Sequence, residues 1–186
     1  MRSTITAIVR NPDLLECTSE SLILAVFEAA EIGIAPTGSL NRAWIVPQTT
    51  RGVKQAELRI GYEGMLDLAK SGDADSVECR AVFKGDEFRV LYGTAPSIVH
   101  VPTFETAKPA DLTHVYAVAT LKSGRTIFEV MTLEQINAIR ARAPGANKGP
   151  WSTDYVQQAR KTVLRRICHY LQLTPQAQGA IEREDR

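Results

Sequence analysis

The stretch THVYAVATLKSGRTIFEVMTLEQINAIR, Thr113 to Arg140, contains two strands, the turn between them and the start of a helix. Residues 113–121 and 126–131 are rich in β-branched and aromatic side chains, as strands are, and KSGR between them is typical of a hairpin turn. Thr132 and Gln135 have the spacing of a capping box, which starts a helix. This stretch therefore predicts an antiparallel hairpin followed by a helix.

More strands precede this stretch. In SVECRAVFK, residues 76–84, apolar and polar residues alternate, which is typical of a half-exposed strand. A Gly-Asp turn and a strand are expected in KGDEFRVLYG, residues 84–93, and another strand in PSIVHVP, residues 96–102. We expect all of these strands to form one central antiparallel sheet. The side chains predicted to share the inner face of the first strand are Val77, Cys79, Ala81 and Phe83.

The N-terminal part contains a helix and two strands. Thr18 or Ser19 is a suitable cap for a helix that ends at Gly33. Two strands, residues 42–47 and 54–60, are joined by a loop that contains Thr49, Thr50, Arg51 and Gly52. The segment GYEG, residues 61–64, then breaks the pattern before a short helix over Met65 to Lys70; its glycines suit a close approach to a ligand or a simple strand-to-helix turn.

The C-terminal part contains a basic helix that starts near Thr153. At 100° per residue its apolar side faces away from Lys161, Thr162, Arg165 and His169. With helices at both ends of a central antiparallel sheet, the fold class is α+β. The residues of the apolar side are Val156, Ala159, Val163, Leu164, Ile167, Tyr170 and Leu171.

Length and composition limit the class of protein. The 186 residues fit a single domain spanning 1–186, with 44% hydrophobic and 23% charged residues. No apolar run reaches the ~18 residues that a membrane-spanning helix needs, and the N-terminus lacks the apolar core of a signal peptide. Three dispersed cysteines suit a reducing cytoplasm and have no metal-ligand spacing.

Positive charge is concentrated in two segments of a chain whose net charge is only +1. Residues 140–166 carry seven basic residues and one acid, Asp154, and residues 36–62 carry four basic residues and one acid. Screening confines each field to about 8 Å at physiological salt, so the local patches matter more than the total.

The basic helix has two interpretations. Cations near the C-terminal end of a helix stabilise its dipole. However, Lys161, Arg165 and His169 are spaced at i, i+4 and i+8 with no acid between them, and this favours contacts with phosphates. Arg160 lies inside the apolar side, which suggests a buried ion pair or a guanidinium that reaches a groove. Trp151 is either a core anchor or a stacking partner for a base.

The usual catalytic motifs are missing from the sequence. It contains no phosphate-binding G-x-x-x-x-G-K-[ST], no G-x-S-x-G and no zinc spacing among its three histidines. Asp73, Asp75, Asp86 and Glu87 could form a two-metal nuclease site, but acids next to glycines are also ordinary turn residues. We therefore expect no catalytic residues and no metal.

Four blocks in order give the chain a family resemblance. They are AAEIGIAPTGSLNRAWIVP, AELRIGYEGMLDLAKSGD, the stretch THVYAVATLKSGRTIFEVMTLEQINAIR, and GPWSTDYVQQARKTVLRRICHYL. Together they resemble the core of the RecT family of phage single-strand annealing proteins, from about Leu15 to Leu173. From this resemblance we expect the N-terminal and C-terminal extensions of the family to be short or absent.

The resemblance implies a β-β-β-α core and a non-enzymatic recombinase. Such a protein binds single-stranded DNA, anneals it to a complementary strand without ATP, and holds the annealed duplex. The resemblance also implies a homo-oligomer, as a ring or helical filament, often beside a phage exonuclease in the cytoplasm of a bacterial host. No cofactor is implied, with magnesium at most a modulator of annealing, and no membrane.

The resemblance also implies a DNA groove made from the two basic segments. Lys161, Arg165 and Arg166 would contact phosphates, and Arg160 would line the floor. Arg51 and Lys54 would lie on a loop at the rim. Further members of the predicted groove are Arg42, Tyr62, Lys148 and Trp151.

Three other classes remain open on the sequence alone. A general nucleic-acid-binding module would share the basic helix without accelerating annealing. A metal-dependent nuclease would use the acids, and a structural oligomer would pack the basic helix on the acidic segment before Gly33 of a neighbour.

Overall fold

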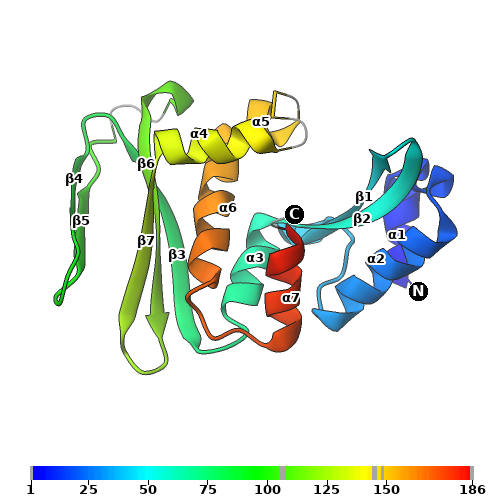
Figure 1. Cartoon of the computed structure of the whole chain (residues 1–186), viewed down its shortest axis with the longest axis horizontal. Coiled ribbons are helices and arrows are strands. Elements are labelled where there is room, and N and C mark those ends of the chain that lie inside the picture. The colour runs from blue at the N-terminus through cyan, green and yellow to red at the C-terminus, as the bar shows by residue number, and fades with distance from the viewer. Residues whose placement is uncertain (1, 105–107, 144–145, 148, 185–186) are drawn as a thin grey trace. The chain divides into compact units, whose positions relative to one another are not determined.

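The computed structural model describes residues 2–104, 108–143, 146–147 and 149–184 (Figure 1). The chain divides into two compact units, which we call unit 1 (Met1–Ala74 with Leu171–Arg186) and unit 2 (Asp75–Tyr170). Helices and antiparallel strands occur in both, so the predicted α+β class is confirmed. The elements in order are α1 (Arg2–Arg10), η1 (Pro12–Glu16), α2 (Ser19–Glu31), η2 (Ser39–Asn41), β1 (Ala43–Thr50), β2 (Val53–Ile60), α3 (Tyr62–Ala69), β3 (Ala74–Phe83), β4 (Glu87–Leu91), β5 (Ser97–Val101), η3 (Pro109–Asp111), β6 (Leu112–Leu121), β7 (Thr126–Thr132), α4 (Leu133–Arg142), α5 (Pro150–Thr153), α6 (Tyr155–Cys168) and α7 (Pro175–Glu184).

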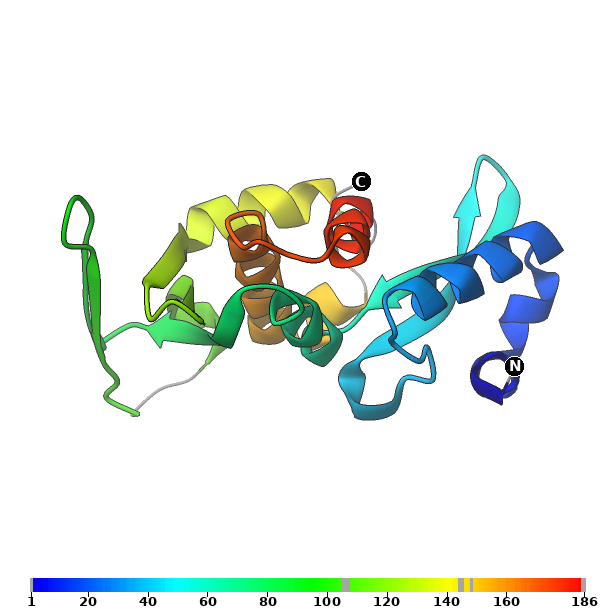
Figure 2. The same ribbon diagram turned by 90° about the horizontal axis from the view of Figure 1, so that it is seen from below.

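In unit 1, helix α2 packs along the hairpin of β1 and β2 (Figures 1 and 2). Thr18 caps α2, as predicted, because its hydroxyl oxygen accepts a hydrogen bond from the Ser21 N–H at 3.3 Å. Ala25 and Ala29 are the buried residues of α2. Such small side chains allow a helix to lie close to a strand.

The turn between β1 and β2 is shorter than the predicted loop. Thr50 pairs with Val53, so only Arg51 and Gly52 lie between the strands. Both have positive φ, 51° and 80°, as in the two-residue turns whose twist matches that of flanking strands. Thr49 and Thr50, expected in the loop, lie on β1. Lys54 lies on β2, as the strand predicted over residues 54–60 has it, and not on the loop that the resemblance implied. The loop is shorter than expected because strand pairing continues through polar residues up to the turn itself.

Helix α3 starts at Tyr62 rather than at the predicted Met65. Just before it, the Gly61 N–H donates to the Arg42 carbonyl oxygen at 2.7 Å. A Cβ at Gly61 would collide with the Asn41 carbonyl oxygen, and one at Gly64 with the Arg42 carbonyl oxygen. The glycines of GYEG therefore allow a close approach of the chain to itself.

The C-terminal segment completes unit 1. The Asp73 N–H donates to the Gln172 carbonyl oxygen at 3.1 Å, and the Gln172 N–H donates to Asp73 Oδ1 at 3.1 Å. Further along, Glu184 of α7 accepts a hydrogen bond from the Ile60 N–H at 2.9 Å. The C-terminal segment is thus hydrogen-bonded to the N-terminal part of unit 1 at two points, near its start at Gln172 and near its end at Glu184.

Unit 2 is built on a three-stranded sheet in the order β3-β6-β7. The predicted hairpin is confirmed: β6 pairs antiparallel with β7 up to Thr120 and Thr126, and the Leu121 N–H donates to the Arg125 carbonyl oxygen at 2.8 Å. The predicted capping box is present as well, with Thr132 and Gln135 bonding each other's backbone N–H at the start of α4.

The two faces of this sheet are covered differently. Helix α6 covers one face, where Val115 and Ala117 of β6 are fully buried. The two-stranded sheet of β4 and β5 lies on the other side (Figure 1). There Phe88 stacks on Tyr116 of β6, with ring centroids 5.6 Å apart. The expectation that β4 and β5 extend the central sheet was therefore wrong. Their contact with it is made through aromatic side chains.

The predicted alternation in β3 holds for only part of the strand. Val77 and Cys79 are buried as expected. Near the end, however, Val82 is the buried residue, while Ala81 and Phe83 are half-buried. Both faces are partly covered there, so polarity no longer separates an inner from an outer face.

Among the helices of the described residues, none has the length and apolar character required to cross a membrane.

Candidate nucleic-acid interface

The basic side of α6 is set by the burial of its other side. Ala159, Val163, Leu164 and Ile167 are all fully buried. Burying one such aliphatic side chain stabilises a fold by roughly 1.5–3 kcal/mol, so the rotation of α6 about its axis is firmly fixed. The cations on the remaining side consequently have defined positions.

The predicted cations of α6 differ in exposure. Lys161 and Arg165 are half-buried, whereas Arg166 and the following His169 are exposed. Thr162 does not belong to this polar side as predicted. It is 6% exposed, because its hydroxyl donates to the Gln158 carbonyl oxygen at 2.9 Å and leaves the methyl group for the core.

The helix also ends earlier than its apolar pattern suggests. Tyr170 was expected on the buried side, but it is 64% exposed. Because α6 ends at Cys168, the helical period does not extend to residue 170. Cys168, which was not expected on the apolar side, is buried.

Arg160 connects α6 to β3. Its Nε and Nη2 atoms donate to the Cys79 carbonyl oxygen at 3.0 and 2.7 Å, and the Cys79 thiol donates to the Arg160 carbonyl oxygen at 3.3 Å. Burial raises the pKa of Cys79 to about 12, even though the nearby guanidinium acts in the opposite direction. The guanidinium thus bonds a main-chain carbonyl of β3, a partner that the sequence had not suggested. A buried ion pair of Arg160 stays a prediction. Contact of Arg160 with DNA stays a prediction.

Arg166 forms an ion pair with β7. Its Nε lies 2.6 Å from Glu129 Oε1, and the two side chains are 45% and 17% exposed. The carboxylate thus comes from a strand that is fixed in the sheet, while the guanidinium faces solvent. Sequence patterns had identified the arginine but not its partner.

Two of the three predicted cations of unit 1, Lys54 and Arg42, also have carboxylate partners. Lys54 Nζ lies 2.6 Å from Glu16 Oε2, and this hydrogen bond lowers the pKa of Glu16 and raises that of Lys54. Arg42 Nε lies 3.2 Å from Asp67 Oδ2. Arg51 is exposed in the β1–β2 turn.

Trp151 lies in an aromatic cluster of unit 2. The Trp151 and Tyr155 ring centroids are 5.8 Å apart, and the Arg140 guanidinium lies over the Tyr155 ring, 5.4 Å from its centroid. The Tyr155 hydroxyl donates to Asn137 Oδ1 at 2.7 Å. Trp151 is half-buried, so one part of its ring system packs on the protein while another part meets solvent.

The predicted site residues fall into two groups. Unit 2 holds Arg160, Lys161, Arg165, Arg166 and Trp151, all on α5 and α6. Unit 1 holds the other group, and Lys148 lies outside the described residues. Within unit 1, Arg42 and Tyr62 lie near the start of α3, and Arg51 and Lys54 lie at the β1–β2 turn.

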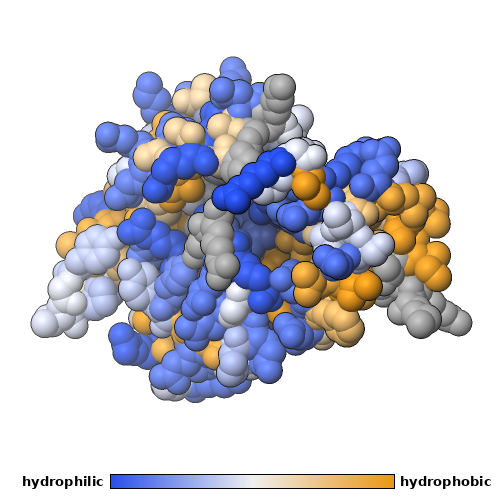
Figure 3. Space-filling model, turned by 45° about the vertical axis from the view of Figure 1, so that its right-hand side comes forward, coloured by the Kyte–Doolittle hydropathy of each residue, from blue (hydrophilic) through white to orange (hydrophobic). Residues whose placement is uncertain are grey.

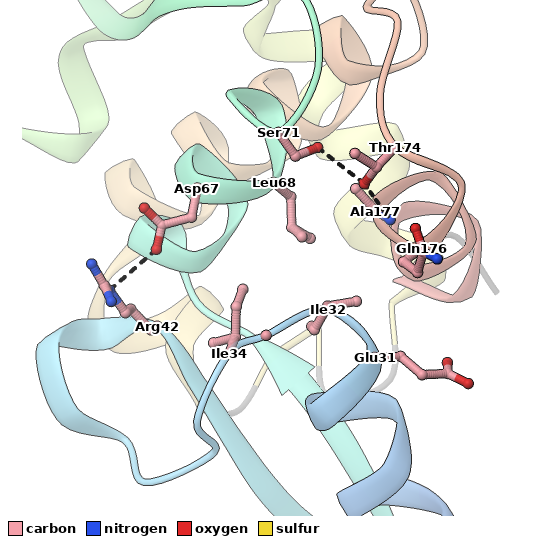
Figure 4. A pocket seen from close by; sticks show the side chains of 11 residues that line it. Glu31, Ile32, Ile34, Arg42, Asp67, Leu68, Ser71, Thr174, Gln176 and Ala177 are labelled. Atoms are coloured by element: carbon pink, nitrogen blue, oxygen red, sulfur yellow. Dashed lines mark hydrogen bonds and ion pairs between the residues drawn. The ribbon is translucent and has the colours of Figure 1, made fainter.

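Unit 1 contains a pocket of about 190 Å³ beside α3 and α7 (Figure 4). Ile34 and Leu68 point toward one another inside it, and the ion pair of Arg42 with Asp67 lies at one side. Ser71 is hydrogen-bonded to Thr174 at 3.4 Å rather than to a base that could activate it. The pocket therefore shows no nucleophile with a partner base.

Two of the acids considered for a nuclease site have structural partners. Asp86 accepts hydrogen bonds from the N–H groups of Phe83 and Thr103 at 2.8 and 2.9 Å, and lies 3.2 Å from His100 Nε2. Asp73 accepts a hydrogen bond from the Gln172 N–H. Within the described ranges, no three His, Cys, Asp or Glu side chains come together as a metal-ligand set.

Comparison with known proteins agrees with the four sequence blocks. The family model described as the RecT family matches residues 1–186. The protein RecT of Escherichia coli (strain K12) is 37% identical over 191 residues, an alignment that spans the whole of this chain and 70% of that protein.

Proposed function

The chain belongs to the RecT family and is a DNA-recombination protein of the annealing type, and from this premise we propose that it anneals single-stranded DNA without ATP. In this proposal the protein holds one strand by its phosphates and leaves the base edges free for a second strand. Sequence is then read by base pairing, and the protein contributes phosphate contacts and stacking.

The observation that best supports the proposal is the division of α6 into two sides. Ala159, Val163, Leu164 and Ile167 of the apolar side are fully buried, and the cations on the other side lie on a helix rather than on a loop. Cations held at fixed positions suit a regularly charged backbone, and each phosphate contact releases counterions. We assign phosphate contacts to Lys161, Arg165 and Arg166.

The remaining predicted residues have secondary roles in the proposal. Arg160 positions α6 through Cys79, and its guanidinium lines the floor of the binding surface. Trp151 and Tyr62 are candidates for stacking on bases, since both rings are only partly covered. Phosphate contacts in unit 1 are assigned to Arg42, Arg51 and Lys54, and in unit 2 also to Lys148.

Assembly into a ring or filament is part of the proposal, and an apolar surface of unit 1 supports it. Ile23, Leu24 and Phe27 of α2 are 55%, 62% and 62% exposed. Figure 3 shows apolar side chains gathered over the N-terminal helices. A second copy of the chain is the occupant we propose for this surface, because large exposed apolar patches commonly mark protein contacts. Other exposed apolar residues of α1 and η1 are Ile5, Val9 and Leu15.

The proposal requires no cofactor, and magnesium would act only by screening DNA charge. A phage exonuclease that produces single strands is the expected partner, and the bacterial cytoplasm the expected place of action. Neither is needed for annealing of purified oligonucleotides, so the activity is testable with the protein alone.

The test is annealing of two complementary oligonucleotides, followed by fluorescence quenching in the absence of nucleotide. We expect the wild type to accelerate annealing and Lys161→Glu/Arg165→Glu to lose the acceleration, with single-strand binding weaker by on the order of tenfold or more. The matched control is Lys122→Glu/Arg125→Glu, which makes the same charge change at exposed residues of the β6–β7 turn. Circular dichroism checks that all three proteins are folded.

Each outcome separates the classes left open by the sequence. A wild type that binds DNA but does not accelerate annealing is a general binding module. Shortening of a labelled strand in magnesium or manganese identifies a nuclease. If the control pair loses as much activity as the α6 pair, net charge and not α6 is responsible. If oligomers dissociate in the α6 variant without DNA, the helix is a structural contact.

A further inference from the structure

Three of the proposed DNA-binding cations are paired with a carboxylate of the same chain. The pairs are Arg166 with Glu129, Lys54 with Glu16 and Arg42 with Asp67, with nitrogen–oxygen distances of 2.6, 2.6 and 3.2 Å. In each pair the two residues come from different segments of the same unit, and Arg42 lies between η2 and β1. A carboxylate binds a guanidinium or ammonium through the same charge-assisted hydrogen bonds that a phosphate makes. Each of these acids is thus placed where a DNA phosphate would bind.

Among the three pairs, Arg166 with Glu129 has the most fixed acid. Glu129 is 17% exposed, whereas Asp67 is 44% and Glu16 67% exposed. It lies on β7, paired with Ala117 of the neighbouring strand, so its backbone cannot move away from α6 without breaking the sheet. The guanidinium, on a long side chain that is 45% exposed, is the more accessible partner.

We propose that Glu129 is a built-in competitor for DNA phosphate at Arg166. The inference rests on the proposed function and concerns how tightly the strand is held. When a phosphate displaces Glu129 from Arg166, part of the binding free energy gained from the new contact is lost, and the uncompensated carboxylate repels the strand. A strand held in this way is released more easily, which suits a protein whose DNA must change partners during annealing.

Competition between Glu129 and phosphate for Arg166 should change how steeply single-strand binding depends on salt. A free cation that binds a single-stranded phosphate releases condensed counterions and adds about 0.7 to the slope of log K against log salt. When a side-chain cation exchanges a carboxylate for a phosphate, the released carboxylate attracts counterions from solution. The contribution of that side-chain cation to the salt slope is therefore smaller. Removal of the carboxylate by mutation should restore the full contribution.

The experiment measures single-strand binding by fluorescence anisotropy across a salt series, for Glu129→Gln, Arg166→Gln and the double variant. We expect Glu129→Gln to bind roughly 1.5- to 5-fold more tightly, the range that corresponds to an exposed ion pair, and with a steeper salt slope. In the Arg166→Gln background the same change should have a much smaller effect, because the group it competes for is absent.

The matched control is Glu87→Gln. Glu87 is also on a strand of unit 2 and is also paired with an arginine, Arg89, at 3.1 Å, but neither belongs to the proposed site. Glu87→Gln removes one negative charge from the same unit, so a general charge effect would appear in both Glu87→Gln and Glu129→Gln. Should Glu129→Gln reduce the folded fraction, Glu129→Thr removes the charge with a residue that favours strands.

The outcomes distinguish a failure of this inference from a failure of the proposed function. The inference is overturned if Glu129→Gln leaves affinity unchanged, if it weakens binding, or if Glu87→Gln tightens binding equally. It is also overturned if the effect of Glu129→Gln persists fully in the Arg166→Gln background. These outcomes leave the proposed function intact as long as the wild type binds and anneals single strands. A wild type that does neither in the same assay overturns both.

Discussion

Helices α2 and α6 have nearly the same length, 13 and 14 residues, but they expose opposite kinds of side chain. Helix α6 buries six residues, and its cations are half-buried (Lys161 and Arg165) or exposed (Arg166). Helix α2 buries only two alanines and leaves Ile23, Leu24 and Phe27 more than half exposed. In α6 the apolar pattern is satisfied inside unit 2, whereas in α2 part of it is not satisfied within unit 1. One helix is therefore suited to a polyanion and the other to an apolar surface.

The largest expected difference between the helices is the effect of removing a leucine. Leu164→Ala in α6 should lower the free energy of unfolding by about 2–5 kcal/mol, because Leu164 is fully buried and a cavity remains. Leu24→Ala in α2 should change it by less than about 0.5 kcal/mol, since Leu24 is 62% exposed. Urea denaturation at a protein concentration that keeps the chain monomeric measures both. Equal losses would contradict the comparison.

The attachment of α6 to the sheet should have the next largest effect. Arg160→Met removes the hydrogen bonds to the Cys79 carbonyl and should cost about 1.5–3 kcal/mol of unfolding free energy. Arg89→Met, at a guanidinium that is 72% exposed, is the control and should cost less than about 0.5 kcal/mol. Chemical denaturation gives both values. A stable Arg160→Met protein that fails to bind DNA would assign Arg160 to the DNA contact instead.

Acid should destabilise unit 2 through Asp86. Desolvation raises the pKa of Asp86, but hydrogen bonds from Phe83, Thr103 and His100 together lower it to about 2. Because the folded-state pKa lies below the unfolded value near ~3.9, the contribution is present above pH ~4 and is lost as the pH falls toward 2. Asp86→Asn should remove on the order of 1–2 kcal/mol at neutral pH and flatten this dependence.

Thermal melts between pH 5 and 2.5 measure that acid response. Glu16→Gln in unit 1 is the control, because Glu16 also has a lowered pKa but is 67% exposed, where solvent screens the pair with Lys54. Its pH dependence should match that of the wild type. If Asp86→Asn loses stability with pH as steeply as the wild type, another group is responsible.

The smallest expected effect on stability is that of a change on the exposed side of α2. Phe27→Ser should alter the unfolding free energy by less than about 0.5 kcal/mol but shift the oligomer distribution toward monomers. Sedimentation velocity, with and without single-stranded DNA, measures the distribution. Glu20→Ser, at an exposed residue of the same helix, should leave it unchanged. Unaltered assembly of Phe27→Ser would mean that this surface is not the subunit contact.

The parts of the fold that depend on local sequence were predictable. The β6–β7 hairpin, the capping box at Thr132 and the cap of α2 at Thr18 depend on neighbouring residues, and all three are present. The separation of β4 and β5 from the central sheet was not predictable, because aromatic contacts such as Phe88 with Tyr116 join distant segments. Helices α1 and α7 are not among the elements that the sequence pattern predicts.

The candidate site was predictable only in its residue types. Lys161, Arg165 and Arg166 stand out by their spacing on one helix. The carboxylate of Glu129 does not, because its contact with Arg166 is made through the packing of α6 on β7 and not through neighbouring positions in the sequence. The main-chain partner of Arg160 on β3 depends on tertiary packing in the same way. Periodicity thus identifies which side chains are available, and packing decides what they bind.

The reciprocal hydrogen bonds between Asp73 and Gln172 bear on how the protein is made. Unit 2 is continuous in sequence from Asp75 to Tyr170, so a nascent chain has all of its residues outside the ribosome before residue 171 emerges. Unit 1 cannot complete its folding until the segment from Leu171 onward is synthesised, because Glu184 of α7 accepts a hydrogen bond from the Ile60 N–H. Ile23, Leu24 and Phe27 of α2, which stay exposed in the complete unit, are therefore carried on an incompletely folded unit while the middle of the chain is synthesised. During translation, this is where a chaperone would bind first.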